Sequence, residues 1–449
     1  MQGTVTQGGG GAPQLRRALR LRDLIFYGII IIQPTAPMPL YGVVAQEARG
    51  HVVTAVLIAM VAMLFTAISY GRMARVYPSA GSAYAYIAGE FGSLPGSLTG
   101  WAVLLDYALN PLICIIWCSS AIANFIPGVP VPVWKIFFAL LFTALNLRGV
   151  ESSAATNKWL AIAMGAVVAY LLFCFTRFVL LNGPHTWDAF GKPFYDPSTF
   201  SVRAISVGTS IAALTYIGFD SISTLSEEAI HPHRDILLAT VFTCLLTGVL
   251  AAVEVYAAQL VWPDFRSFPN LETAYVYVAG RAGGPVAFGI LNATLLIATI
   301  GSGAAAMLGA ARLLYGMGRS GALPRTFAHI SPHTNIPNWN VIICGAVALI
   351  GALTVSYQLG AELLNFGAFL AFLGVNASAF HHYWLKGRDR SWSQGLPPIL
   401  GGAICFYIWL SLRPQAKVVG FTWMAIGLAY YFVRRFSRAA SSSPSTGQY

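Results

Sequence analysis

Long apolar segments recur along the whole chain and constrain its fold more than any other feature. A helix that crosses a bilayer needs about 20 mostly apolar residues. Twelve stretches approach that length: 23–48, 52–76, 95–126, 130–147, 158–182, 204–228, 236–262, 285–317, 339–358, 361–383, 397–412 and 418–434. Because the backbone polar groups of a lipid-facing segment must be satisfied internally, the sequence predicts an all-α polytopic membrane protein with twelve transmembrane helices.

The charge content excludes most soluble classes of protein. Only 10% of the residues are charged, whereas soluble domains carry about 25%. A soluble enzyme, a nucleic-acid-binding domain and a disordered scaffold are therefore excluded. The 6 cysteines lie inside apolar segments and show no metal-ligand spacing, and the sequence contains neither GxSxG nor HExxH. We expect no cofactor, no metal site and no enzymatic activity.

The distribution of basic residues predicts the orientation of the chain. With the N-terminus inside the cell, 18 of the 27 Lys and Arg residues fall on the cytoplasmic side. Such an excess is typical of cytoplasmic loops. The net charge of +11 therefore reads as an orientation signal rather than a nucleic-acid-binding surface. We expect a multi-pass protein of the cytoplasmic (inner) membrane with cytoplasmic tails at 1–21 and 435–449.

Two of the apolar segments contain interruptions. The first segment carries Pro34, Pro37 and Pro39 after Gln33, and each proline lacks an amide donor and disturbs a helix. The sixth segment contains a glycine, hydroxyl groups and Asp220 between Thr215 and Ser221. Irregular backbone at membrane depth is tolerated only where it faces protein or a wet cavity.

The positions of these interruptions indicate an internal repeat. Segments one and six are corresponding members of two five-helix halves, predicted at 22–182 and 204–383. Because five is odd, the second half must be inverted relative to the first. Helices 11 and 12, at 397–434, follow the repeats. Matched broken helices are the best pointer in a sequence to the substrate site of a transporter.

Several motifs resemble the amino acid–polyamine–organocation (APC) superfamily. The matching stretches are Ser69-Tyr70-Gly71-Arg72, Tyr77-Pro78, Ala80-Gly81-Ser82-Ala83-Tyr84, Gly218 to Glu228, His231 to Ile236, Arg312 to Arg319 and Leu323-Pro324. A narrower resemblance is to bacterial putrescine importers, on Leu104 to Tyr107, Leu225 to Glu228 and Asn365 to Ala368. These resemblances imply a LeuT-type 5+5 inverted repeat, alternating access and use of the proton motive force.

Asp106 and Tyr107 lie deep in the third segment, where no Lys or Arg is nearby. An ionisable residue at that depth is costly unless it faces a cavity or a partner. Asp106 could pair with a substrate ammonium group, and Tyr107 could offer a ring face for a cation–π contact. The alternative for Asp106 is a carboxylate held by hydroxyl groups or a helix end.

The second interruption supplies Tyr216, Gly218, Phe219 and Asp220. Asp220 could bind an amine or carry a proton, and the alternative is a cap on the amides of Ser223 or Thr224. Tyr216 and Phe219 could line or gate the site, or could simply pack.

The first interruption discriminates between substrates. Amino acid carriers of the superfamily commonly place a glycine-rich nest there, whose amides bind the substrate carboxylate. In this chain three prolines remove donors. Gln33, Thr35 and Ala36 remain as candidate substrate contacts. A substrate with amine groups and no α-carboxylate fits this segment best.

Ion coupling has several candidates. Sodium-coupled relatives use hydroxyl groups of helix eight, and Ser302 is one candidate. Proton-coupled relatives can use a lysine within helix five, where this chain has Met164 and Gly165. We favour a proton carried by Asp220, Asp106 or Glu254. Glu227 is a candidate gate residue that could pair with Arg234, or a loop cap.

The sequence therefore predicts a secondary active importer of a small cationic amine such as putrescine, working by alternating access and coupled to protons rather than sodium. The alternative is an amino acid transporter or exchanger of the same fold. The expected partners are this small molecule, the proton and the lipid bilayer, with no nucleic acid.

Overall fold

The structure is a computed structural model that describes residues 17–79, 81–148, 154–182, 186–319, 323–331, 336–387 and 391–441. Of the predicted tails, residues 1–16 and 442–449 lie outside this part of the chain. The described residues are helical and contain no named strand; one isolated parallel bridge joins Leu19 to Ala229.

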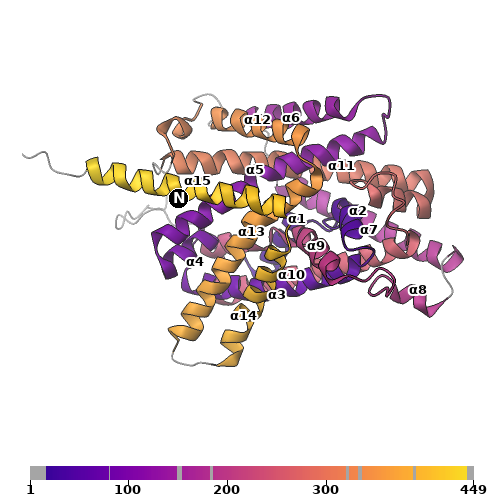
Figure 1. Cartoon of the computed structure of the whole chain (residues 1–449), viewed down its shortest axis with the longest axis horizontal. Helices are drawn as coiled ribbons and strands as arrows, with labels where there is room; N and C mark the ends of the chain where they lie inside the picture. Colours follow the sequence, from indigo (N-terminus) through magenta and orange to yellow (C-terminus); the bar gives the residue numbers. More distant parts are fainter. Residues whose placement is uncertain are drawn as a thin grey trace, which may run out of the picture.

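Fifteen α-helices and five short helices follow one another along the described chain (Figure 1). The α-helices are α1 (Leu21–Ile32), α2 (Tyr41–Glu47), α3 (Val52–Val76), α4 (Ser82–Phe91), α5 (Ser93–Ala123), α6 (Val131–Leu147), α7 (Ala154–Asn182), α8 (Trp187–Gly191), α9 (Val202–Ala212), α10 (Pro232–Val261), α11 (Ala274–Arg319), α12 (Asn338–Thr354), α13 (Tyr357–Phe380), α14 (Trp392–Leu410) and α15 (Pro414–Ser441). The short helices are η1 (Met38–Leu40), η2 (Ala213–Tyr216), η3 (Phe219–Glu227), η4 (Arg325–Ala328) and the π-helix η5 (His381–Leu385).

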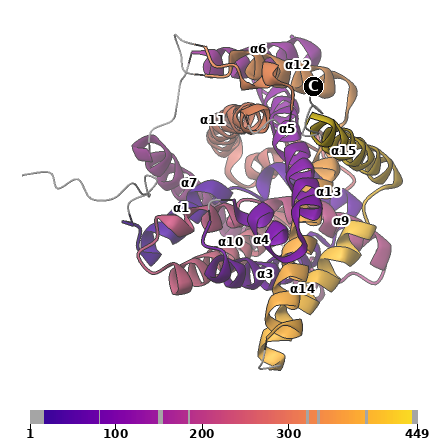
Figure 2. The same ribbon diagram turned by 90° about the vertical axis from the view of Figure 1, so that its left-hand side faces the viewer.

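Within the described residues, 8 helices are long and apolar enough to cross a membrane. They comprise α3, α5, the α9 to η3 segment, α10, α11, α13 and parts of α7 and α15. Two shorter apolar helices, α6 and α12, lie side by side at one edge of the bundle (Figures 1 and 2). The chain is an all-helical polytopic membrane protein.

Several predicted limits were wrong. The eighth segment, expected at 285–317, begins directly after a kink at Gly284, as predicted, but its helix ends at Arg319, and a further helical part, from Ala274, precedes the kink. Tyr357 opens α13 instead of closing the preceding helix, because the Ser356 side chain caps the new helix. The last helix continues to Ser441, beyond the limit expected at 434. Helix α4 was not predicted as an element at all.

Candidate substrate site

The first interruption is a short non-helical segment between α1 and η1. Helix α1 ends at Ile32, and Gln33 turns the chain with a φ of 68°, which is unusual for a residue other than glycine. Thr35 is 1% exposed. Its hydroxyl group donates to Met164 Sδ of α7 at 3.4 Å. A thioether therefore faces the segment at the position where a lysine was sought in the sequence.

Turn hydrogen bonds consume most of the amide donors of this segment. The Ala36 N–H donates to the Gln33 carbonyl at 3.2 Å, and the Met38 N–H donates to the Thr35 carbonyl at 3.1 Å. Pro34 has no N–H that could reach the Ile30 carbonyl. Within the described chain, no backbone donor serves the carbonyl groups at 30–32. The segment is thus poor in donors and rich in acceptors, which favours a cationic partner over a carboxylate.

The second interruption separates η2 from η3. Gly218 adopts a φ of 122°, a left-handed conformation that favours glycine. Its N–H donates to Asp220 Oδ1 at 3.3 Å. The alternative role predicted for Asp220, capping of the Ser223 or Thr224 amide, has no such bond among the described residues; instead Ser223 Oγ donates to the Asp220 carbonyl at 2.6 Å.

The two interruptions touch each other. A Cβ atom on Gly218 would lie 2.7 Å from Ile31 Cγ2. Gly28 of α1 similarly faces Ile222 of η3, so the two half-helices pack along their length. The residues just before α1 also join the end of η3, because the amide of Leu19 donates to the Glu228 carbonyl at 3.0 Å. Close contact therefore joins two segments nearly 190 residues apart in the sequence.

Asp106 comes from α5 and lies beside this junction. Its carboxyl group is half-buried, and the charge of Asp220 acts on it. Gly367 of α13 positions this part of α5, because its Cα packs against the Ala102 carbonyl and leaves no room for a side chain. The two carboxyl groups that the sequence singles out are thus within range of a charge interaction.

Four tyrosines lie within range of the charge of Asp220, and two of them, Tyr70 and Tyr107, also lie within range of that of Asp106. The charge of Asp220 acts on the hydroxyl groups of Tyr27, Tyr70, Tyr86 and Tyr107. Tyr107 was a predicted site residue, and the other three were missed. Tyr70 belongs to the APC-like motif at the end of α3. This motif was the only feature of the sequence that could have identified Tyr70 as a site residue. Its buried hydroxyl group has no hydrogen-bond partner in the described chain.

Two predicted aromatic residues are held by packing instead. Tyr216 is fully buried, and its hydroxyl group donates to the Val56 carbonyl of α3 at 2.9 Å. Phe219 is also fully buried, with its ring 5.5 Å from those of Tyr70 and Phe372. Phe219 therefore supports the wall behind Tyr70, whereas Tyr216 points toward α3.

The remaining candidates lie apart from the carboxyl pair. Glu254 of α10 is fully buried, and neither of its carboxyl oxygens has a hydrogen-bond partner among the described residues. Ser302 of α11 lies against Cys114 of α5. Glu227 is the last residue of η3, beside the contact with the N-terminal segment. In the described ranges no group of His, Cys, Asp or Glu side chains could hold a metal ion.

Comparisons with known proteins agree with this architecture. A family model described as amino acid permease matches residues 24–433. The low-affinity putrescine importer PlaP of Escherichia coli (strain K12) is 33% identical over 427 residues, 93% of each chain. The branched-chain amino acid permease BcaP of Lactococcus lactis subsp. cremoris is 26% identical over 93% of this chain and 94% of its own. The methylthioribose transporter of Bacillus subtilis is 24% identical over 93% of each.

Proposed function

Since the chain belongs to the amino acid permease family of the APC superfamily, we propose that it is a secondary active transporter that imports a small cationic amine, similar to putrescine, by alternating access. Its relatives are permeases, importers and transporters, so a transport role suits it better than an enzymatic one. The observation that carries the choice of substrate is the donor-poor first interruption, which lies against the segment that carries Asp220.

The site matches the chemistry of a diamine. Two half-buried carboxyl groups that interact are costly when both are charged and unpaired. Two ammonium groups on one flexible ligand would neutralise both. The rings of Tyr27 and Tyr107 offer faces for cation–π contacts with the same ligand, and the unserved carbonyl groups of the first interruption provide further acceptors. In the first interruption as described, turn bonds already occupy the amides of Ala36 and Met38, which an α-carboxylate would need.

The wider architecture is part of the proposal. We take the interrupted α1 to α2 segment and α14 as spans, which together with the 8 long helices and the shorter α6 and α12 make twelve. The repeats at 22–182 and 204–383 then form a LeuT-type inverted pair. Helices 11 and 12, at 397–434, follow the second repeat. We place the protein in the cytoplasmic membrane of a bacterial cell, with both termini in the cytoplasm.

Competition between matched ligands tests the substrate class. Purified protein in proteoliposomes should take up labelled putrescine, and excess diamine should block this uptake. Each amino acid should compete less well than the amine formed by removing its carboxyl group, for example ornithine less well than putrescine. Better competition by the carboxylate-bearing partner would favour the amino acid transporter, for which the identity with BcaP is the supporting observation.

We propose that Glu254 carries the coupled proton. Its full burial without a partner for either oxygen makes a permanent charge there costly, unless a proton neutralises it. In the Glu254→Gln variant, accumulation driven by an imposed pH gradient should fall at least about tenfold, because the coupled proton is lost. Counterflow of substrate without a gradient should continue. The exposed Asp188→Asn on α8 is the matched control, and undiminished accumulation in Glu254→Gln would reject this role.

A further inference from the structure

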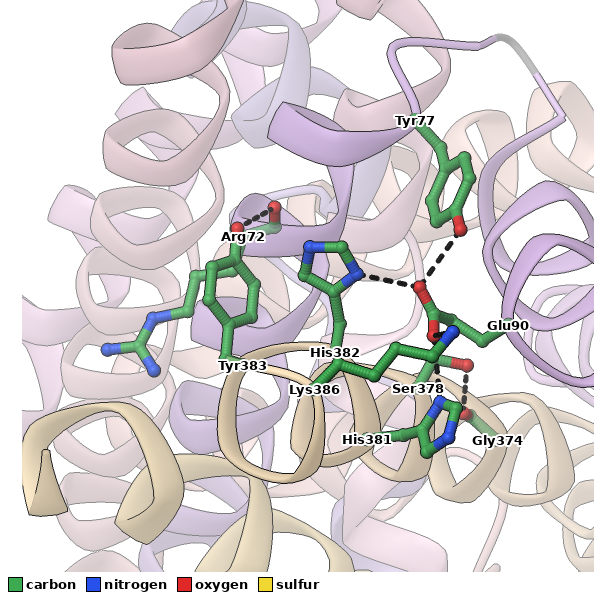
Figure 3. Close-up of polar contacts among 9 residues, drawn as sticks. All are labelled: Arg72, Tyr77, Glu90, Gly374, Ser378, His381, His382, Tyr383 and Lys386. Atoms are coloured by element: carbon green, nitrogen blue, oxygen red, sulfur yellow. Dashed lines mark hydrogen bonds and ion pairs between the residues drawn. The ribbon is translucent and has the colours of Figure 1, made fainter. Parts of the chain in front are cut away.

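Glu90, near the end of α4, gathers four side chains around one carboxylate (Figure 3). Its Oε1 accepts from Tyr77 at 2.9 Å and from His382 Nδ1 at 2.8 Å. Its Oε2 accepts from His381 Nδ1 at 2.8 Å and from Lys386 Nζ at 3.2 Å. The Glu90 side chain is only 1% exposed. We call these five residues the Glu90 cluster.

The cluster joins two elements that are distant in sequence. Helix α4 connects the spans α3 and α5, whereas His381, His382 and the rest of η5 form a π-helical end to α13. Single π-helical turns are frequently found at functional sites. Burial raises the pKa of Glu90, but the hydrogen bonds from His381, His382, Tyr77 and Lys386 outweigh it and lower the pKa to about 2. The link is thus a charged one at neutral pH.

The α13 side of this link is anchored to neighbouring spans. Tyr383 of η5 donates to the Arg72 carbonyl at 2.9 Å. The Arg72 guanidinium group in turn donates to the carbonyl groups of Ser393 and Gln394, both at 2.9 Å. Helices α3, α13 and α14 therefore form a braced unit against which α4 is held.

The opposite end of α4 reaches the candidate substrate site. Ser82 Oγ lies 2.7 Å from Ser223 Oγ of η3, and Ser223 Oγ donates to the backbone carbonyl of Asp220. Tyr86, one helical turn into α4, feels the charge of Asp220. Residues 82 to 90 span about 12 Å of helix. If this helix moves as a rigid body, a displacement of Glu90 also displaces Ser82 and Tyr86 at the second interruption.

We propose that the Glu90 cluster is a latch that sets the position of α4. While the latch is closed, α4 holds Ser82 and Tyr86 against η3 and covers the predicted cytoplasmic side of the carboxyl pair. When α4 leaves η5, the same two side chains withdraw and the pocket opens toward the cytoplasm. Glu90 is a positioning residue in this mechanism, since it touches no substrate. The proposal rests on the transport function proposed above.

A cysteine pair reports the position of α4 without any ligand. In protein carrying Ser82→Cys and Ser223→Cys, oxidation should form a disulfide rapidly, because the parent oxygens lie 2.7 Å apart. Adding Glu90→Gln should slow this cross-linking at least about fivefold, since a neutral amide forms weaker hydrogen bonds than a carboxylate. His382→Ala, which removes one donor at a half-exposed position, should slow it less. Asp188→Asn in the same background should leave it unchanged.

Transport supplies the second readout. Glu90→Gln should lower the maximal rate of uptake while the dose of diamine needed for thermal stabilisation changes little, because the carboxyl pair is intact. Equal cross-linking in Glu90→Gln, His382→Ala and parent protein would overturn the latch. Failure of every amine to stabilise any variant would instead count against the proposed substrate and leave the cross-linking result decisive for the latch.

Acid stability offers an independent check on the charge of Glu90. The pKa in the folded protein, about 2, lies below the ordinary value of 4.5. The ionised group therefore contributes stability that is fully present above about pH 4.5 and is lost as the pH falls toward 2. The difference in melting temperature between parent and Glu90→Gln protein should shrink over this range. A difference that stays constant down to the lowest pH would contradict the assignment.

Discussion

In the Asp106→Asn variant, the affinity for a linear diamine is expected to fall at least about thirtyfold, a loss of about 2 kcal/mol. The variant leaves one of the two ammonium groups without its counter-ion at a half-buried site. A monoamine of equal chain length needs only one carboxylate and can use Asp220, so its affinity should change less than about threefold. Ligand-dose dependence of the melting temperature measures both affinities on the same sample.

Asp220→Asn provides the mirror experiment. If the two carboxyl groups hold opposite ends of one ligand, each single variant should lose the preference for diamine over monoamine. The double variant should then lose less than the sum of the two, because neighbouring groups that share a ligand do not act additively. Asp188→Asn controls for the change in charge. A diamine preference that survives in Asp106→Asn would remove Asp106 from the site.

The two interruptions were predictable because their causes are local. Pro34, Pro37 and Pro39 break a helix in any surroundings, since the missing amides belong to the residues themselves. Gly218 beside a carboxylate at membrane depth is a similar local signal. The structure shows both interruptions where the sequence predicts them. The contact between Ile31 and Gly218 was not predictable from spacing alone, and the analogy of matched breaks in transporters supplied that expectation.

Most of the tyrosines near Asp220 could not be predicted from the sequence. Tyr27, Tyr70 and Tyr86 come from α1, α3 and α4, and only the packing of these three elements turns their hydroxyl groups toward Asp220. In an apolar membrane segment a tyrosine gives no periodic signal that separates a pocket wall from a helix contact. For Tyr216 the sequence suggested a role that the structure does not support. Its position in an interrupted segment predicted a gate, but its hydroxyl group donates to a carbonyl group of α3.

Helix α4 and the Glu90 cluster escaped prediction for another physical reason. Span counting seeks runs of about 20 apolar residues, and α4 is a 10-residue helix between two such runs. His381 and His382 read as ordinary residues at a helix end. Only the fold brings them to Glu90, 291 and 292 residues away. Ionic contacts between helices that are distant in sequence are set by tertiary structure and leave little trace in local sequence.

The contact between the two interruptions yields the other large expected effect. In Gly218→Ala, uptake should fall below about a tenth of the parent rate, because a non-glycine residue at positive φ is strained by about 1–3 kcal/mol. The added Cβ would also meet Ile31 Cγ2 at 2.7 Å, which pushes the two half-helices apart and shifts Asp220 away from Asp106. Uptake into proteoliposomes and diamine-dependent melting should both decline.

Two companions separate this effect from general destabilisation. Gly289→Ala in α11 adds the same methyl group where no heavy atom lies within 4 Å, so its uptake should match the parent. Ile31→Ala combined with Gly218→Ala removes the atom that the new Cβ meets but keeps the strained φ, and uptake should recover in part. Uptake by Gly218→Ala at the parent rate would contradict this prediction. It would mean that the two interruptions need not be in close contact for the substrate to bind and be transported.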